Sequence, residues 1–160
     1  MKEIVYIETT IVSYLVSRPS RDLVLSAQQQ LTRDWWDEER RKYACITSEA
    51  VLREAMQGDR EMALARLKAL EGIQVIRVTE EVEAMASRIM ATGALPQTMR
   101  PDATHLAAAT LSGADYLLTW NCRHLANAHV LRRLHREAGR QNWRLPGVCT
   151  PLELMGDSEL

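Results

Sequence analysis

The chain has 160 residues, of which 46% are hydrophobic and 26% charged, with a formal net charge of −1 at pH 7. These values are typical of a globular protein with a substantial core, and they argue against a disordered chain and against a whole surface that binds polyanions. No apolar run approaches the roughly 20 residues of a membrane span. The three cysteines, which lack metal-like spacing, favour a reduced, cytoplasmic protein.

The first half of the chain predicts three strands separated by helices. The apolar run "IVYI" (4–7) predicts a buried strand, and residues 9–16 carry apolar side chains at helical spacing. Ser20 or Asp22 can cap a long helix that runs to about residue 42. The strand "YACIT" precedes helices capped by Ser48 and Asp59, which we expect to end near residues 58 and 70. A third strand, "IQVIRV", leads to a helix that Thr79 caps.

The second half continues the alternation. A loop, "GALPQTMRP", precedes the Ala-rich helix "DATHLAAATLSG", which we expect to begin at Asp102. The strand "DYLLTW", the mostly helical "NCRHLANAHVLRRLHREAG" and the short strand "GVCT" follow. Because strands alternate with helices throughout, we expect a single α/β domain over residues 1–160, with a parallel sheet of about five strands covered on both faces.

Four polar residues map to the carboxyl ends of these strands, where ligands of open α/β sheets gather. They are Glu8, Glu54, Asp102 and Asn121. Each also has a purely structural interpretation. Glu8 suits a helix N-terminus, Glu54 can be a solvated helix residue, and Asp102 and Asn121 can be helix caps. That all four fall on one sheet edge favours a shared site.

Three carboxylates in one place repel each other and are stable mainly when a cation compensates them. Oxygen ligands without Cys or His suit a hard ion, Mg²⁺ or Mn²⁺. Such a site predicts phosphodiester hydrolysis by metal-activated water. No Ser–His–Asp order or nucleophilic cysteine signature favours a covalent route.

The order of these motifs resembles the PIN domain, and nearly the whole chain takes part. The matching segments are "VYIETT", "SEAVLREAMQGD" and "PDATHLAAATLSGADYLLTWNCRHL". Within that family the chain looks most like the VapC-like toxins of bacterial toxin–antitoxin pairs. The resemblance implies a PIN-like three-layer sandwich, a metal-dependent ribonuclease that cuts RNA, an antitoxin partner and a homodimer.

The same resemblance implies roles for individual residues. Glu8, Glu54 and Asp102 become the metal ligands, and Asn121 completes the catalytic set, with Thr10 and Thr119 lining the pocket. The chain departs from the family pattern twice, since the first acid is usually Asp and the fourth position is often Asp. One fewer negative charge at Asn121 predicts that a second cation binds only weakly.

Several residues near these motifs are candidate substrate contacts. His105 either contacts the scissile phosphate or is a hydrogen-bonded core or rim residue, and Trp120 either stacks on a base or packs internally. Arg53 and Arg123 are candidate phosphate contacts. Arg123 also opens a stretch to residue 144 with six arginines and one acid, which suits either a solvated helix face or a basic wall beside a phosphate site.

Two further interpretations follow from the residues. A PIN fold with a degraded site, serving as an RNA-binding or scaffolding module, is the alternative function, and the departures at Glu8 and Asn121 support it. The helices between residues 48 and 70 carry apolar residues on more than one face. Because a helix buries one stripe in its own core, the second predicts a homodimer through this region. One stripe comprises Leu64, Leu67 and Leu70, and the other Met62, Ala65 and Ala69.

Overall fold

The structure, a computed structural model, describes residues 1–156. Residues 157–160, which the single-domain prediction includes, lie outside this range. The strands are β1 (Ile4–Ile7), β2 (Ala44–Ser48), β3 (Gln74–Ile76), β4 (Tyr116–Leu118) and β5 (Gly147–Cys149). The helices are α1 (Thr9–Val16), α2 (Leu23–Asp34), α3 (Glu49–Ala55), α4 (Arg60–Ala69), α5 (Glu80–Ala91), α6 (Arg100–Leu111) and α7 (Ala128–Gln141).

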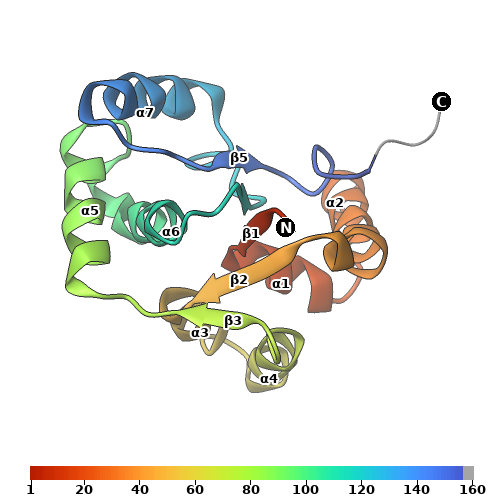
Figure 1. Ribbon diagram of the computed structural model, residues 1–160. Helices are drawn as coiled ribbons and strands as arrows, with labels where there is room; N and C mark the ends of the chain where they lie inside the picture. Colours follow the sequence, from red (N-terminus) through yellow and green to blue (C-terminus); the bar gives the residue numbers. More distant parts are fainter. Residues whose placement is uncertain (157–160) are drawn as a thin grey trace.

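The five strands form one parallel sheet in the order β3-β2-β1-β4-β5. The connections β1–β2–β3 run across the sheet in one direction, and the connections β3–β4–β5 run in the opposite direction. Because each crossover is right-handed, the helices of the first set cover one face of the sheet and those of the second set cover the other. Figure 1 shows α1 and α2 on one side of the sheet and α5, α6 and α7 on the other. The predicted α/β three-layer fold with a five-stranded parallel sheet is confirmed.

Burial explains the strand assignments. Val5, Tyr6 and Ile7 of β1 have no exposed area, and Leu117 and Leu118 of its neighbour β4 are equally buried. A strand covered on both faces needs a nearly continuous apolar run, which is what residues 4–7 provide. The central pair β1–β4 is therefore the most enclosed part of the sheet, and it is also the place where the direction of the connections reverses.

Most predicted helix starts are correct, because side-chain caps fix them. Asp22, Ser48, Asp59 and Thr79 each accept a hydrogen bond from a backbone N–H in the first turn of α2, α3, α4 and α5. The long helix expected to reach residue 42 ends instead at Asp34, and a π-helical turn (Trp35–Glu39) and a 3₁₀ turn (Arg40–Lys42) follow it.

Two predicted helix starts are wrong. The Ala-rich helix begins at Arg100, two residues earlier than expected, because Pro101 is compatible with the first turn. The last long helix begins only at Ala128, where the side chain of Asn127 caps it. Residues 121–126 form a turn, closed by bonds from the N–H groups of Leu125 and Ala126 to the Asn121 carbonyl.

Among the described residues, no helix combines the length and apolar character that a bilayer crossing needs.

Candidate metal site

Glu8 lies where β1 ends and α1 begins, and its side chain is buried, with 4% exposed. One carboxylate oxygen, Oε2, accepts bonds from the backbone N–H of Thr10 (3.0 Å), the Thr10 hydroxyl and the Thr119 hydroxyl (2.8 Å). Glu8 therefore is the cap of α1, as its structural interpretation proposed. Its other oxygen, Oε1, takes no part in these three bonds, so capping does not use up the carboxylate.

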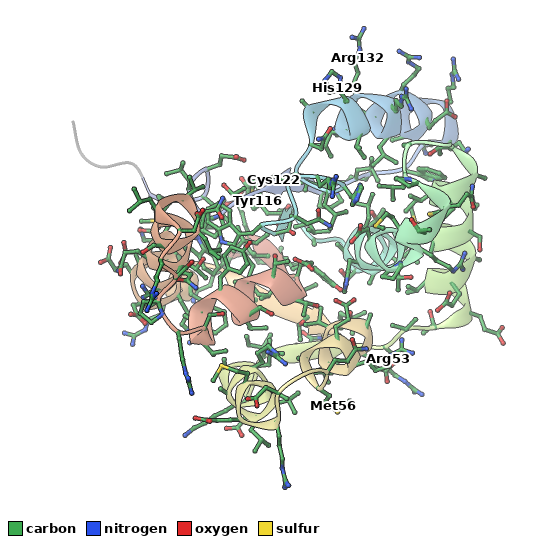
Figure 2. The ribbon with its side chains drawn as sticks, turned by 180° about the vertical axis from the view of Figure 1, so that it is seen from behind. Arg53, Met56, Tyr116, Cys122, His129 and Arg132 are labelled. Carbon is green, nitrogen blue, oxygen red and sulfur yellow. The ribbon has the colours of Figure 1, made fainter. Side chains whose placement is uncertain are left out.

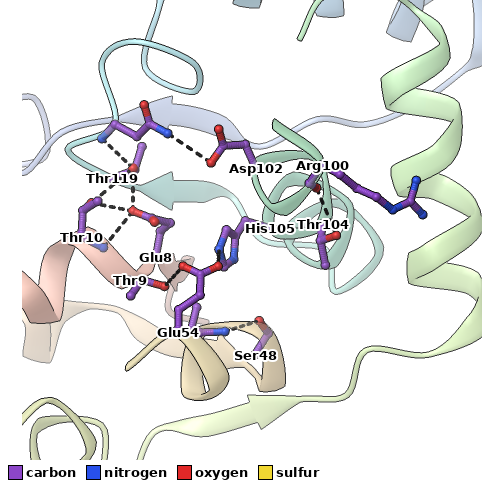
Figure 3. A network of polar contacts seen from close by, with 12 residues as sticks. Glu8, Thr9, Thr10, Ser48, Glu54, Arg100, Asp102, Thr104, His105 and Thr119 are labelled. Atoms are coloured by element: carbon purple, nitrogen blue, oxygen red, sulfur yellow. Dashed lines mark hydrogen bonds and ion pairs between the residues drawn. The ribbon is translucent and has the colours of Figure 1, made fainter. Parts of the chain in front are cut away.

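Glu54 reaches the same edge from the sixth position of α3. Its Oε2 accepts a bond from the Thr9 hydroxyl (2.8 Å), and its Oε1 lies 2.6 Å from Nε2 of His105 (Figure 3). Burial tends to raise the pKa of the Glu54 carboxyl, but the bonds from His105 and Thr9 outweigh burial and hold that pKa below its usual value. Glu54 is thus an ionised carboxylate with a fixed orientation.

Asp102 is the third residue of α6, and Met99 occupies the cap position, so Asp102 is not the N-cap that the structural interpretation required. Its Oδ1 accepts a bond from Nδ2 of Asn121 (3.1 Å). Its Oδ2 is buried and has no hydrogen-bond partner among the described residues. Burial and the negative charge of Glu8 raise the pKa of Asp102. A buried carboxylate oxygen without a donor requires an explanation, and a cation would supply one.

Asn121 follows β4 and orients Asp102 from the opposite side of the site. Its side-chain oxygen accepts a bond from the N–H of His124 (3.1 Å), and its own N–H donates to the Thr119 hydroxyl (2.9 Å). Asn121 therefore closes the turn that follows β4 and does not cap α7. The expectation that Glu8 and Asn121 share one edge of the sheet is confirmed, since Thr119 bonds to both.

The tightest cluster of possible ligand atoms contains a residue that the sequence did not place there. Atoms of Glu8, Glu54 and His105 all lie within 4.8 Å of one another, and Asp102 is not a member of that group. His105 is 1% exposed, and both ring nitrogens have partners: Glu54 at Nε2 and the Tyr6 hydroxyl at Nδ1 (2.8 Å). Burial lowers the pKa of His105, but Glu54 and Glu8 outweigh burial and raise it.

The other candidate substrate contacts divide between the interior and the surface. Thr10 and Thr119 point at Glu8, whereas the side chains of Arg53 and Arg123 are exposed. Trp120 is 8% exposed, donates from Nε1 to the Thr32 hydroxyl (2.7 Å) and stacks on Tyr14. Trp120 is thus a packing residue, and a role in base stacking would require it to leave this position.

The residues present fit a hard divalent cation. Within residues 1–156, no Lys or Arg side chain forms an ion pair with Glu8, Glu54 or Asp102. Negative charge therefore accumulates at a half-buried edge of the sheet, and within the described residues the Asp102 Oδ2 atom has no donor. Carboxylate oxygens are the ligands that Mg²⁺ and Mn²⁺ prefer. Glu8, Glu54 and Asp102 would hold the ion.

A cavity of about 370 Å³ opens beside this cluster and shares Glu54 with it. Its walls include Arg53 of α3, Gln57 just after that helix, and Arg100 and Thr104 of α6. Arg100 is held by Glu83 (3.0 Å), whereas no hydrogen bond or ion pair is formed by the Arg53 side chain within residues 1–156. A depression between α3 and α6 therefore leads from the surface to Glu54.

Sequence reasoning missed two residues of this network. Thr9 follows Glu8 directly, and the "ETT" motif assigned a role to Thr10 only. The sequence shows that Thr9 has a hydroxyl but not where that hydroxyl points, because its direction depends on how α1 packs against α3. Tyr6 was assigned to an apolar strand, and a buried tyrosine in such a strand carries no sequence signal that it bonds to a histidine 99 residues away.

Comparison with known proteins supports the fold. No protein-family model matches the chain, and no curated protein matches it in sequence. Eleven chains of solved structures are similar, among them the following two. One is VapC20 of Mycobacterium tuberculosis, described as a toxin that cleaves the sarcin-ricin loop, with TM-score 0.56 and 18% identity over 71% of this chain and 86% of that chain. The other is VapBC2 of Rickettsia felis, bound to a DNA fragment from its promoter, with TM-score 0.54 and 13% identity over 92% of this chain and 98% of that chain. The chain thus has the PIN-like fold of VapC-type proteins.

Proposed function

We propose that the protein is a ribonuclease that depends on Mg²⁺ or Mn²⁺ and hydrolyses RNA phosphodiester bonds, and that it acts as the toxin of a toxin–antitoxin pair. The observation that carries the proposal is the set of acids at the carboxyl edge of β1 and β4. Glu8 and Glu54 converge there, and Asp102 adds a buried oxygen without a donor. The similarity to VapC20, described as a toxin that cleaves the sarcin-ricin loop, supports RNA as the substrate.

Each residue has a defined task in this proposal. Thr10 and Thr119 fix the buried carboxylate of Glu8, and Asn121 fixes Asp102, so that the acids are in place before an ion arrives. When bound, the ion supplies activation of water and stabilises negative charge on the phosphate oxygens. The exposed Arg53 side chain, in the wall of the adjacent cavity, can bind a flanking phosphate.

The arginines of α7 supply a second, more distant attraction for RNA. Arg132, Arg133, Arg136 and Arg140 are exposed, and only Glu137 opposes them within that helix. Figure 2 shows His129 and Arg132 projecting outward from α7. Such a cluster attracts a polyanion without reading its sequence.

The test is cleavage of single-stranded RNA by the purified protein in Mn²⁺ or Mg²⁺, with EDTA as the control. Water attack breaks one phosphorus–oxygen bond and leaves a linear terminal phosphate on one product and a hydroxyl on the other. We expect those ends, no 2′,3′-cyclic phosphate, and no cleavage in EDTA. Cyclic ends or cleavage that resists EDTA would contradict the proposal.

A degraded PIN fold that only binds RNA is the second candidate, and the neutral Asn121 at the fourth position favours it. It predicts binding of the same RNA without metal-dependent cleavage, so the cleavage assay separates the two functions.

The proposed antitoxin is a small neighbouring gene product, and the similarity to VapBC2 supports such a partner. A short reading frame with a DNA-binding segment immediately upstream of this gene would be its expected source. A cytoplasmic location accords with the three free cysteines, Cys45, Cys122 and Cys149.

We further propose that two copies pair through α3 and α4. Leu64 of α4 is 59% exposed, whereas Leu70, in the same stripe, is buried. Met56, which directly follows α3, is 56% exposed. A partner copy would cover the exposed part. We expect a dimer in sedimentation at tens of micromolar, which Leu64→Glu converts to a monomer. Leu111→Glu, which alters an exposed leucine of α6, is the control and should leave the dimer intact. A monomeric parent would exclude this interface.

A further inference from the structure

A continuous line of hydrogen bonds joins the centre of the sheet to Glu54. Tyr6, in β1, has no exposed area, and its hydroxyl lies 2.6 Å from the Ser48 hydroxyl and 2.8 Å from Nδ1 of His105. His105 in turn lies 2.6 Å from Glu54 (Figure 3). The line crosses β1, β2, α6 and α3, and only Glu54 at its end meets solvent. Nothing in the proposed hydrolysis requires a tyrosine at this depth.

The direction of the protons follows from what each group can donate. An ionised carboxylate only accepts, so Nε2 of His105 donates to Glu54. When the imidazole is neutral, Nδ1 is the acceptor and the Tyr6 hydroxyl donates to it. When the imidazole is protonated, Nδ1 donates to the Tyr6 hydroxyl instead, and Nε2 donates to Glu54 in both states. The Ser48 hydroxyl donates to Tyr6 and accepts from the N–H of Val51 (3.4 Å). Every proton in this arrangement has an acceptor, and the Tyr6 bond selects the tautomer with hydrogen on Nε2.

This arrangement decides where the Glu54 carboxylate points. Glu54 sits on a helix with a third of its side chain exposed, and a glutamate there ordinarily samples several rotamers. Here His105 holds one oxygen and Thr9 holds the other. The remaining lone pairs are left for a ligand between Glu54 and Glu8. The imidazole is therefore a support for the carboxylate, because its Nε2 position carries a proton.

We infer that Tyr6 and His105 are positioning residues that hold Glu54 in its metal-binding orientation, Tyr6 acting through His105. The inference rests on the proposed metal site, and it adds a buried support to that site. Hydrogen-bonded partners of metal ligands commonly change metal affinity by about 10–100-fold when they are removed, so the effect is measurable without RNA.

The first test is the dissociation constant of Mn²⁺, measured by calorimetry on the metal-free full chain and on Tyr6→Phe, which removes only the hydroxyl. We expect Mn²⁺ binding to weaken by about 10-fold or more. Thr32→Val is the matched control, since the Thr32 hydroxyl is also buried and accepts a bond from Trp120, and its Kd should equal that of the parent. An unchanged Kd in Tyr6→Phe would overturn the inference.

The second test asks whether Tyr6 acts through His105. In His105→Gln the amide N–H can still donate to Glu54, so we expect it to bind Mn²⁺ more tightly than His105→Ala. Adding Tyr6→Phe to His105→Ala should cause no further loss, because the link is already broken. An additive loss would show that Tyr6 acts independently of His105, and equal Kd values for the glutamine and alanine variants would show that the donor to Glu54 is irrelevant. Either result overturns the inference. If Tyr6→Phe does not fold, the comparison of the two His105 variants decides.

These readouts separate the inference from the proposed function. A parent that binds Mn²⁺ but does not cleave RNA refutes the ribonuclease, while the ranking of Kd values still decides the role of Tyr6. A parent that binds no Mn²⁺ refutes both.

Discussion

Asp102→Asn is expected to reduce Mn²⁺-dependent cleavage of single-stranded RNA by orders of magnitude while the fold persists. The side-chain oxygen of the new asparagine can still accept the hydrogen bond from Nδ2 of Asn121, so the one side-chain hydrogen bond described for Asp102 is kept. The charge that would bind the ion is lost, and metal activation supplies much of the reduction in the barrier. The measurement is the cleavage rate of parent and variant at saturating RNA.

The same substitution should stabilise the metal-free protein in a pH-dependent manner. The folded pKa of Asp102 is raised above its ordinary value of 3.8, so the folded state resists ionisation of this group. Below pH 3.8 the Asp102 carboxyl is protonated in both the folded and the unfolded state, so it does not change the free energy of unfolding. As the pH rises, the unfolded state ionises first, and the parent loses stability until the pH passes the folded pKa. Thermal unfolding in EDTA should therefore show a gain for Asp102→Asn at neutral pH that disappears in acid.

Asp115→Asn is the matched control for the cleavage measurement. Asp115 precedes β4 at the opposite edge of the sheet, where its carboxylate accepts a bond from the N–H of Ile4 (2.8 Å). Its replacement should leave the cleavage rate unchanged. Equal activity of Asp102→Asn and the parent would remove Asp102 from the site.

Glu8→Gln is expected to reduce Mn²⁺-dependent cleavage of RNA by as much as Asp102→Asn does. The side-chain oxygen of glutamine can accept the three bonds that now reach Oε2, from Thr10 and Thr119, so the start of α1 keeps its cap. The negative charge closest to the sheet is lost, and with it the attraction for a cation. Cleavage in Mn²⁺ is again the measurement.

Glu39→Gln is the control for this variant. Glu39 is also a buried glutamate, 7% exposed, but within residues 1–156 its carboxylate pairs with Lys42, three residues away, and with no residue of the candidate site. Its cleavage rate should match the parent. Activity retained in Glu8→Gln would show that Glu8 only caps the helix.

The fold was predictable because its signals are local. The apolar run of β1 and the caps Asp22, Ser48 and Asp59 each depend on residues within a few positions of one another, and the alternation of strands and helices then limits the topology. Errors occurred where a local signal had two meanings. Pro101 was assigned to a loop although it is equally compatible with the first turn of α6, and Asn121 was a possible cap although it closes a turn.

The candidate site was predictable only in part. That Glu8 and Asn121 share an edge follows from strand order, since Glu8 directly follows β1 and Asn121 comes three residues after the end of the neighbouring parallel strand β4. The place of His105 does not follow, because its helix spacing from Asp102 allows either a solvent-facing or a buried ring. Its burial depends on how α6 packs over β1 and α3, a relation between segments about 50 to 100 residues apart. No local pattern encodes such a contact.

Calorimetric titration of Mn²⁺ into the metal-free parent, beside Asp102→Asn and Glu8→Gln, tests the central claim most directly. Three carboxylates and one amide predict one measurable site in the parent and at most a much weaker second one. Each variant should lose the first site while its fold, followed by circular dichroism, stays that of the parent. The same Mn²⁺ affinity in all three proteins, or no binding to the parent, would contradict a metal site formed by Glu8, Glu54 and Asp102.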